Sequence, residues 1–249
     1  MGEVVVERDA FTLMADAERT HWWFRARRDF ITAAFERIAP PPGATILDAG
    51  CGSGGNLEVL SRFGEVAGFE YDAEALEVAR KRGVGRVEPG SLPDGIPFGD
   101  DRFTAIGLFD VLEHLEHPVP SLSALCQRLV SGGALVLTVP ANPWLWGPHD
   151  VQCQHYRRYT ANTLREHLAA AGFDIEYLSY FNSLLLPLAI VQRVKERVVG
   201  YNLAAMPGSG MNGLLHRIWR AERRWIPTRV APFGLSLIAI ARRPHAPSR

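Results

Sequence analysis

The chain carries the stretch ILDAGCGSGGNLEVL at residues 46–60. The apolar run over 45–49 predicts a buried strand, and the glycines after it predict a turn where the backbone takes positive φ and a ligand approaches closely. A helix predicted from Asn56 adds its unpaired N–H donors to the same place. The stretch therefore predicts a strand, a ligand-binding loop and a helix.

Strands and helices alternate on the C-terminal side of this loop. We expect further strands over 65–69, 85–88, 105–109, 134–139, 173–180 and 235–241, with helices over 56–63, 73–82, 121–129 and 160–171. Such alternation predicts a mostly parallel sheet covered by helices on both faces. Residues 1–40 are expected to form an N-terminal helical cap that ends at three prolines, and 41–249 the main domain.

The alternation is interrupted over 181–232. This segment contains two basic amphipathic stretches, LLLPLAIVQRVKERV and LLHRIWRAERRWI, on either side of a glycine-rich link at 207–210. Between residues 192 and 229 there are eight Lys and Arg against two Asp and Glu. We expect a helical insertion that contacts an anionic membrane surface through 184–229 or covers a long apolar substrate. The alternative is a lid or dimer contact with a solvated basic face.

Composition limits the class of protein. With 249 residues, 47% hydrophobic and 22% charged, the chain is long and apolar enough for a globular core, and disorder over the whole length is excluded. The three cysteines form no CxxC pair, which predicts a reducing compartment. No signal-like or membrane-spanning run is visible, so we expect a cytoplasmic protein with peripheral contact at the inner face of the membrane.

Charge is distributed unevenly. Residues 1–150 hold 13 Lys and Arg against 22 Asp and Glu, whereas 151–249 hold 14 against 5. The asymmetry predicts an anionic substrate or surface near the basic half, or a solvated basic face. The acidic first half and the absence of a recognised nucleic-acid module argue against nucleic acid as a partner.

Two cofactor motifs fit the glycine loop. Gly50, Gly52 and Gly55 satisfy the dinucleotide pattern GxGxxG, with Glu70 twenty residues past Gly50. Asp48, Gly50, Gly52 and Gly54 also satisfy D-x-G-x-G-x-G. A carboxylate at the tip of the second strand accepts two ribose hydroxyls in either case, because it is a bidentate acceptor.

The segment EPGSLPDGIPFGDDRFTAIGLFDVLEHLEHP at 88–118 separates the two motifs. Together with the D-x-G-x-G-x-G loop and SGGALVLTVP at 131–140, it resembles the class I S-adenosylmethionine-dependent methyltransferases. The resemblance covers about 45–180. It implies S-adenosylmethionine as the cofactor, and an α/β fold with a Rossmann-like, doubly wound, seven-stranded sheet. That sheet is mostly parallel, with an antiparallel last strand and the helical insertion before it.

The resemblance also implies the cofactor contacts. The acidic residue of the loop orients a network at the amino-acid end of the cofactor, the turn at 90–92 contacts adenine, and the end of the fourth strand lines the cleft. Carried onto this chain, the cofactor-binding residues are Asp48, Gly50, Cys51, Gly52, Gly54, Glu70, Tyr71, Ser91, Leu92, Phe109 and Asp110.

Two further motifs point to an acceptor site. HWWF at 21–24 and HYRRY at 155–159 resemble a bacterial methyltransferase subgroup associated with glycan and lipid-linked sugar loci. A histidine in the loop after the fifth strand suits a general base, and we take His155 first and His149 second. Acceptor contacts are expected from Trp22, Trp23, Arg157, Arg158 and Tyr159. The alternatives are structural aromatics and an ordered loop with surface arginines.

Asp110, Glu113 and His114 resemble the metal-ligand set of quinone-type O-methyltransferases, with Asp110 in place of their Glu. Metal-independent relatives carry the same Leu-Glu-His, and we expect no metal. The sequence thus predicts methyl transfer, with oxygen favoured, to a hydroxyl of a sugar, glycan or lipid-linked metabolite, the acceptor being a small or lipid-linked molecule. A quinone or small natural product as acceptor, or a catalytically silent binding protein, are the alternatives. An NAD oxidoreductase is disfavoured by Asp48 and by residues 88–118.

Overall fold

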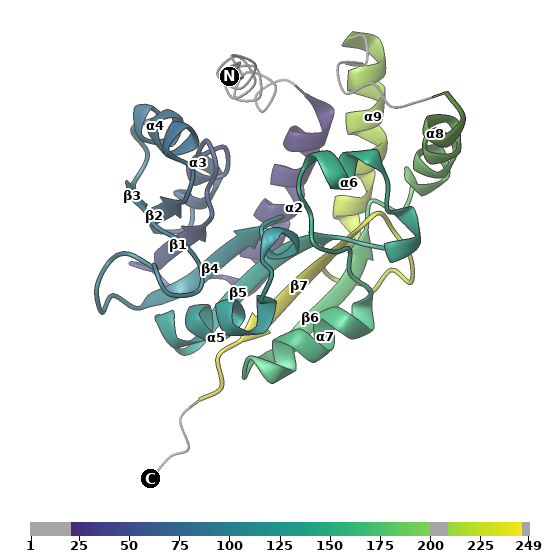
Figure 1. Cartoon of the computed structure of the whole chain (residues 1–249). Coiled ribbons are helices and arrows are strands. Elements are labelled where there is room, and N and C mark those ends of the chain that lie inside the picture. Colours follow the sequence, from purple (N-terminus) through teal and green to yellow (C-terminus); the bar gives the residue numbers. More distant parts are fainter. Residues whose placement is uncertain (1–20, 200–208, 246–249) are drawn as a thin grey trace, which may run out of the picture.

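The computed structural model describes residues 21–199 and 209–245 and is built on one seven-stranded sheet (Figure 1). The strand order is β3-β2-β1-β4-β5-β7-β6. The first five strands of that order pair in parallel, and β7 runs antiparallel to both of its neighbours. The bounds are β1 Thr45–Ala49, β2 Glu65–Glu70, β3 Arg86–Pro89, β4 Phe103–Phe109, β5 Leu129–Pro140, β6 Asp174–Phe181 and β7 Ser236–Arg242. The predicted fold class is confirmed.

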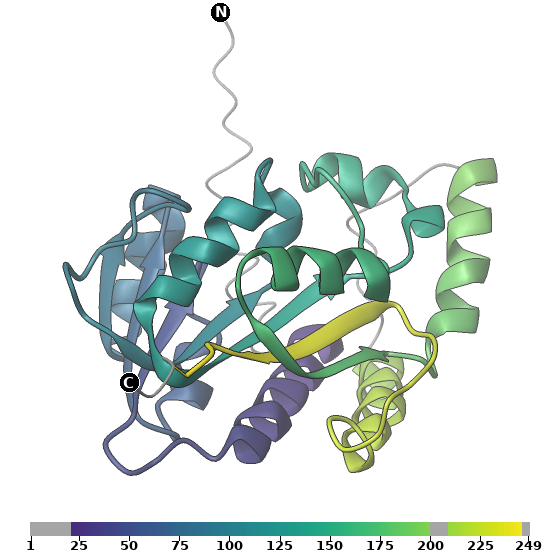
Figure 2. The same cartoon turned by 90° about the horizontal axis from the view of Figure 1, so that it is seen from below.

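Helices cover both faces of the sheet (Figure 2). One face carries α2 (Trp22–Ile38), α3 (Leu57–Leu60), α4 (Ala73–Lys81) and α9 (Ser209–Ala221). The other carries α5 (Pro118–Arg128) and α7 (Ala161–Ala170). Two hydrophobic clusters therefore fill the space on either side of the sheet.

The period of two along the strands explains why both faces are apolar. In β5, Val136 belongs to the cluster under α2, whereas Leu135 and Leu137 belong to the cluster under α5 and α7. Successive strand side chains point to opposite faces, so a strand buried on both faces reads as a continuous apolar run. The run GALVLTVP predicted this strand for that reason.

The N-terminal helix α2 is joined to the core. Its buried residues include Phe30, Ile31 and Phe35, and Trp219 of α9 packs against Phe30 with ring centroids 5.8 Å apart. The His21 side chain caps the helix by accepting a hydrogen bond from the Trp23 N–H. Helix was expected over 1–40, and residues 1–20 lie outside the described part of the chain.

The segment before β7 is helical, as predicted. It contains α8 (Leu186–Val199), α9 and the short 3₁₀ helix η3 (Glu222–Arg224). Of the expected link at 207–210, residues 207 and 208 lie outside the described part of the chain, and 209 and 210 begin α9. The predicted helix over 56–63 is shorter than expected, because only Leu57–Leu60 is helical. Over residues 21–199 and 209–245, no helix combines the length and apolarity that crossing a bilayer requires.

Candidate active site

The glycine loop joins β1 to α3 at the carboxyl end of the sheet. Gly50, Gly52 and Gly54 have φ values of +69°, +55° and +79°, in the left-handed region that favours glycine. A Cβ atom on Gly50 would lie 2.8 Å from Val111 Cγ2, whereas one on Gly52 would meet nothing within 4 Å. The loop is therefore tightly packed at Gly50 and open at Gly52, where a ligand has room to approach.

Glu70 connects this loop to the tip of β2. Its Oε2 accepts a hydrogen bond from the Gly52 N–H at 2.7 Å, and its Oε1 accepts from Tyr71 and Asp72 N–H at 2.9 and 3.0 Å. On the adjacent strand β1, Asp48 is buried with 1% exposure. Two carboxylates thus flank the loop at neighbouring strand ends, where a doubly wound sheet places its ligand crevice.

Asp110 lies at the end of β4 beneath α2. Its backbone is left-handed (φ +53°), and its Oδ1 accepts a hydrogen bond from Thr138 Oγ1 at 3.2 Å. Its Oδ2 forms an ion pair with Arg27 Nη2 at 2.8 Å. Arg27 is 12% exposed and its guanidinium lies 5.1 Å from the ring centroid of Trp23. Helix α2 therefore closes over the carboxyl end of β4.

The loop after β5 holds a buried aspartate against a histidine. Asp150, in the short helix α6 (Pro148–Gln152), has no solvent exposure. Its Oδ1 lies 3.0 Å from His155 Nδ1 and accepts a hydrogen bond from Arg158 Nε at 2.7 Å. Its Oδ2 accepts from the Gly147 N–H at 2.9 Å. Burial opposes ionisation of Asp150, but the hydrogen bonds from His155 and Arg158 outweigh it and lower the pKa of this carboxyl.

His155 is oriented by this contact toward the short 3₁₀ helix η1 (Leu112–His114), which follows β4. The His155 and His114 rings are perpendicular with centroids 4.7 Å apart. The Tyr156 N–H donates to the Glu113 carbonyl at 2.8 Å, which ties the β5 loop to η1. Because the buried carboxylate holds one imidazole nitrogen of His155, the other nitrogen is left for a proton transfer.

Glu113 is the buried acid of this group, with 1% exposure, and its Oε2 accepts no hydrogen bond within the described residues. Burial, together with the nearby charge of Asp110, raises the pKa of Glu113 well above its usual range. Burial, together with the proximity of His155, lowers the pKa of His114. Both groups are thus shifted toward their neutral forms, as burial away from water favours.

Two separate groups of residues are candidates for binding a cofactor and a metal. The space at Gly52 and the carboxylate of Glu70, a hydrogen-bond acceptor, fit the ribose of the cofactor that the resemblance implies. Glu113, His114 and His155 offer ligand atoms that all lie within 4.8 Å of one another, a donor set that transition metals accept. The expectation that the protein uses no metal stays a prediction.

A model for the methyltransferase domain matches residues 20–178, more than half of the chain. The chain belongs to this family. It is a class I methyltransferase, and its cofactor is S-adenosylmethionine. The glycine loop, Glu70 and the end of β4 lie at the carboxyl edge of the sheet, where doubly wound folds place their ligand crevice. That these residues bind the cofactor stays a prediction.

Curated relatives resemble parts of this methyltransferase. The mitochondrial ubiquinone biosynthesis O-methyltransferase of Schizosaccharomyces pombe is 31% identical over 47% of this chain and 46% of its own. A probable tRNA methyltransferase 9B of Homo sapiens is 34% identical over 39% of this chain and 22% of its own. The alignments thus span less than half of either relative.

Among solved structures, the phosphoethanolamine N-methyltransferase 2 of Haemonchus contortus in complex with S-adenosyl-L-methionine has the same fold. The TM-score is 0.58 at 19% identity, and the alignment covers 86% of this chain and 52% of that chain. This likeness supports the fold and no particular acceptor.

The residues predicted to contact an acceptor lie in different surroundings. Trp22 and Trp23 are half-buried and pack against Trp219 at centroid distances of 5.4 and 6.3 Å, so both brace α9 on α2. Tyr159 is 1% exposed, lies in the core and directs its hydroxyl to the Leu112 carbonyl at 3.5 Å. The ring of Tyr159 is thus part of the core cluster, and the expected contact between Tyr159 and an acceptor stays a prediction.

The two arginines of the HYRRY motif also differ. Arg158 is 8% exposed and bonds to Asp150 and to the Ala141 carbonyl, so it holds the loop. Arg157 donates to the Glu116 carbonyl at 2.9 Å. Asp150 and Arg27 were missed as functional residues, although Asp150 lies between the two candidate histidines in the sequence. His149 contacts Cys153 Sγ at 3.6 Å, and its ring centroid lies 6.2 Å from that of His155.

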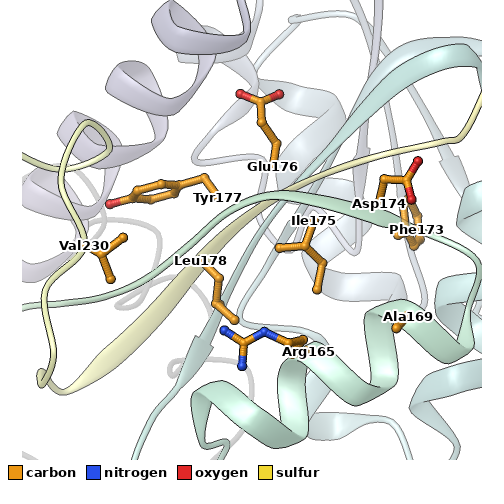
Figure 3. Close-up of a pocket in the computed structure, with 9 residues that line it drawn as sticks. All are labelled: Arg165, Ala169, Phe173, Asp174, Ile175, Glu176, Tyr177, Leu178 and Val230. Carbon is orange, nitrogen blue, oxygen red and sulfur yellow. The ribbon is translucent and has the colours of Figure 1, made fainter.

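An open depression of about 410 Å³ lies elsewhere, along the free edge of β6 (Figure 3). None of the predicted site residues lines it. Its lining comes from α7, β6 and the segment before β7, and consists of Arg165, Ala169, Phe173, Asp174, Ile175, Glu176, Tyr177, Leu178 and Val230.

Proposed function

We propose that this protein transfers the methyl group of S-adenosylmethionine to a hydroxyl oxygen of a small or lipid-linked acceptor. The observation that supports this best is the buried Asp150–His155 contact, which sits against η1 at the exit of β4. Oxygen nucleophiles gain from a positioned base, and an imidazole ordered by a buried carboxylate supplies one near neutral pH.

The chemistry assigned to this chain is alignment and proton removal. When bound, the cofactor supplies a methyl group activated by a sulfonium. His155 takes the acceptor's hydroxyl proton on Nε2 as the O–C bond forms and the S–C bond breaks, leaving S-adenosylhomocysteine and protonated His155. Asp150 stabilises the imidazolium that results, and Glu113 and His114 form the neighbouring wall. Alignment of the reacting atoms contributes several kcal/mol, on the order of 5 or more.

A sugar, glycan or lipid-linked metabolite is the acceptor class we favour, on the likeness of HWWF and HYRRY. A phenolic hydroxyl of a quinone precursor is the second candidate, because a curated relative is named for ubiquinone biosynthesis. Both classes use the same oxygen chemistry at His155. We also propose that the protein contacts the inner face of a membrane peripherally.

The first test measures methyl transfer from labelled S-adenosylmethionine. The purified protein is incubated with separate pools of sugar nucleotides, catechols, a bacterial lipid extract and tRNA, with and without a chelator. We expect label in a hydroxyl-bearing sugar, phenol or lipid product, unaffected by the chelator. Label in tRNA alone, or transfer abolished by the chelator and restored by a metal, would contradict the acceptor or the metal-free chemistry.

His155→Gln tests the base. Gln keeps the size and polarity of the side chain but does not take up a proton, so turnover is expected to fall by about 10²–10⁴-fold. Affinity for S-adenosylhomocysteine is expected to stay within twofold, because His155 lies on the acceptor side. His167→Gln, on α7, is the matched control and keeps full turnover. Unchanged turnover in His155→Gln with the identified acceptor would remove His155 from this role.

A further inference from the structure

Helix α8 exposes apolar side chains to solvent. Leu188 and Val191 lie three residues apart on one side of α8 and are 52% and 65% exposed. Ile190 is 37% exposed, and Leu184, in the turn before the helix, is 48% exposed. Arg193 is 16% exposed and points inward, with its Nη2 3.8 Å from Asp150 Oδ2. An amphipathic surface helix normally buries its apolar stripe and exposes its charges. Here an arginine packs inward while leucine and valine face out.

Two further exposed apolar side chains lie in the loop between β5 and α7, which we call the acceptor loop. Trp144, in the 3₁₀ helix η2 (Pro143–Leu145), is 57% exposed, and Val151 of α6 is 63% exposed. Figures 1 and 2 both show α8 beside the segment that contains α6. The ion pair between Arg193 and Asp150 joins the two elements. We call Trp144, Val151, Leu184, Leu188 and Val191 the apolar rim.

The rim lies next to the proposed base. Asp150, which Arg193 contacts from α8, is the same carboxylate that orients His155. An acceptor that reaches His155 from the side of α8 therefore passes the rim. Exposed apolar clusters of this kind mark contact with an apolar partner.

Charge identifies the partner. Residues 192–229 carry eight Lys and Arg against two Asp and Glu. Of these, Arg193 is paired with Asp150 and Arg223 with Glu36, whereas Arg217 and Arg224 are exposed. Basic groups beside an apolar stripe match anionic headgroups over acyl chains, and exposed Trp is favoured at the membrane interface. Two copies of the chain facing each other through this region would instead bring like charges together.

We propose that the apolar rim binds the surface of an anionic lipid bilayer and receives the acceptor from it. The acceptor part of this statement rests on the proposed methyl transfer, whereas the binding part does not. In this proposal, the rim side chains of α8, η2 and α6 and of the turn before α8 enter the headgroup layer. The acceptor is then a molecule that is itself anchored in lipid.

The test is sedimentation of the full chain with vesicles, without cofactor. Vesicles of one part phosphatidylglycerol to three parts phosphatidylcholine are compared with pure phosphatidylcholine. We expect saturable binding to the anionic vesicles, weakened by high salt, and little binding to the neutral ones. The double substitution L188S/V191S is expected to lower the partition coefficient at least tenfold, and W144S to lower it by a smaller factor.

Val230→Ser is the matched control. Val230 is 68% exposed, like Val191, but lies in the depression along β6 (Figure 3), away from the rim. Binding in this variant is expected to equal that of the parent. Thermal unfolding and calorimetry with S-adenosylhomocysteine show whether each variant keeps its fold and cofactor site.

The proposal fails if no vesicle binds, if neutral vesicles bind equally, or if L188S/V191S binds as the parent does. It also fails if the parent self-associates in solution and L188S/V191S abolishes that association, because the rim would then cover a second copy. Cofactor binding and transfer to a soluble acceptor are measured separately, so a failure here leaves the proposed chemistry standing.

Discussion

At the residue scale, Asp150 has two roles that sequence spacing does not reveal. Its Oδ1 contacts both His155 and Arg158, and its Oδ2 contacts the Gly147 N–H. A buried carboxylate is costly unless its oxygens are satisfied by donors and opposite charges. Here those donors come from the acceptor loop itself, so the same contacts that stabilise the loop also orient the proposed base.

The burial of Glu113 is expected to lower the stability of the folded protein at high pH. Because its folded-state pKa is raised, its contribution to stability is complete below the ordinary Glu pKa and is lost as pH rises through the folded-state value. Glu113→Gln removes the ionisation while keeping the size of the side chain. We expect the variant to be more stable than the parent at pH 8, by on the order of 1 kcal/mol, with a smaller gain at pH 5.

Urea unfolding at both pH values measures this difference. Glu58→Gln, at an exposed position on α3, is the control and should leave the pH dependence unchanged. A parent protein that gains stability relative to Glu113→Gln between pH 5 and pH 8 would show that Glu113 is ionised and paired in the folded protein.

At the element scale, two properties characterise the glycine loop: the left-handed φ of its glycines and the free space around them. Gly43 and Gly52 are both left-handed, at +76° and +55°, and an added Cβ meets nothing within 4 Å at either position. Alanine at either position therefore costs similar backbone strain, about 1–3 kcal/mol. Only Gly52 lies in the loop that Glu70 contacts.

Gly52→Ala and Gly43→Ala form a matched pair on this basis. We expect both variants to unfold at lower temperature than the parent, by similar amounts. Gly52→Ala is expected to weaken S-adenosylhomocysteine binding at least tenfold, because its methyl group occupies the open side of the loop, and Gly43→Ala is expected to bind normally. Equal affinities in calorimetry would place the cofactor away from Gly52.

The elements themselves could be predicted from the sequence because strands buried on both faces and glycine turns are local signals. Thr45–Ala49 matches the predicted strand, and the insertion before β7 is helical. Strand β5 begins five residues earlier than predicted, at Leu129, because Leu129 pairs with Phe103 of β4. The helix predicted over 56–63 ends at Leu60, because the residues after it form a tighter turn in which the Phe63 N–H donates to the Leu60 carbonyl at 2.9 Å.

At the scale of the whole molecule, the site is assembled from segments far apart in sequence. Arg27 reaches Asp110, and Arg193 reaches Asp150, so α2 and α8 each contact the cleft from a different side. Such pairs depend on how the helices pack on the sheet, and one sequence contains no signal for them. The motif residues were predictable, whereas the core position of Tyr159 and the packing of Trp22 and Trp23 on α9 were not.

The arrangement explains the uneven charge of the chain. The acidic first half contains the glycine loop, Glu70 and Asp110, and the basic second half contains α8, which contacts the acceptor loop through Arg193, and α9, which packs on α2. A cationic cofactor sulfonium and an acceptor at an anionic surface would approach from these two halves. On the proposed function, the charge asymmetry of the sequence would match a cationic cofactor at one half and an anionic surface at the other.

The most direct test of the account is calorimetric titration with S-adenosylhomocysteine, using the parent protein and Glu70→Ala. We predict micromolar binding by the parent, no binding of NAD, and at least a tenfold loss in Glu70→Ala, because hydrogen bonds to a charged group contribute about 1.5–3 kcal/mol each. Binding of NAD alone, binding of neither ligand, or equal affinity in Glu70→Ala would contradict the assignment of the carboxyl edge of β1 and β2 as the cofactor site.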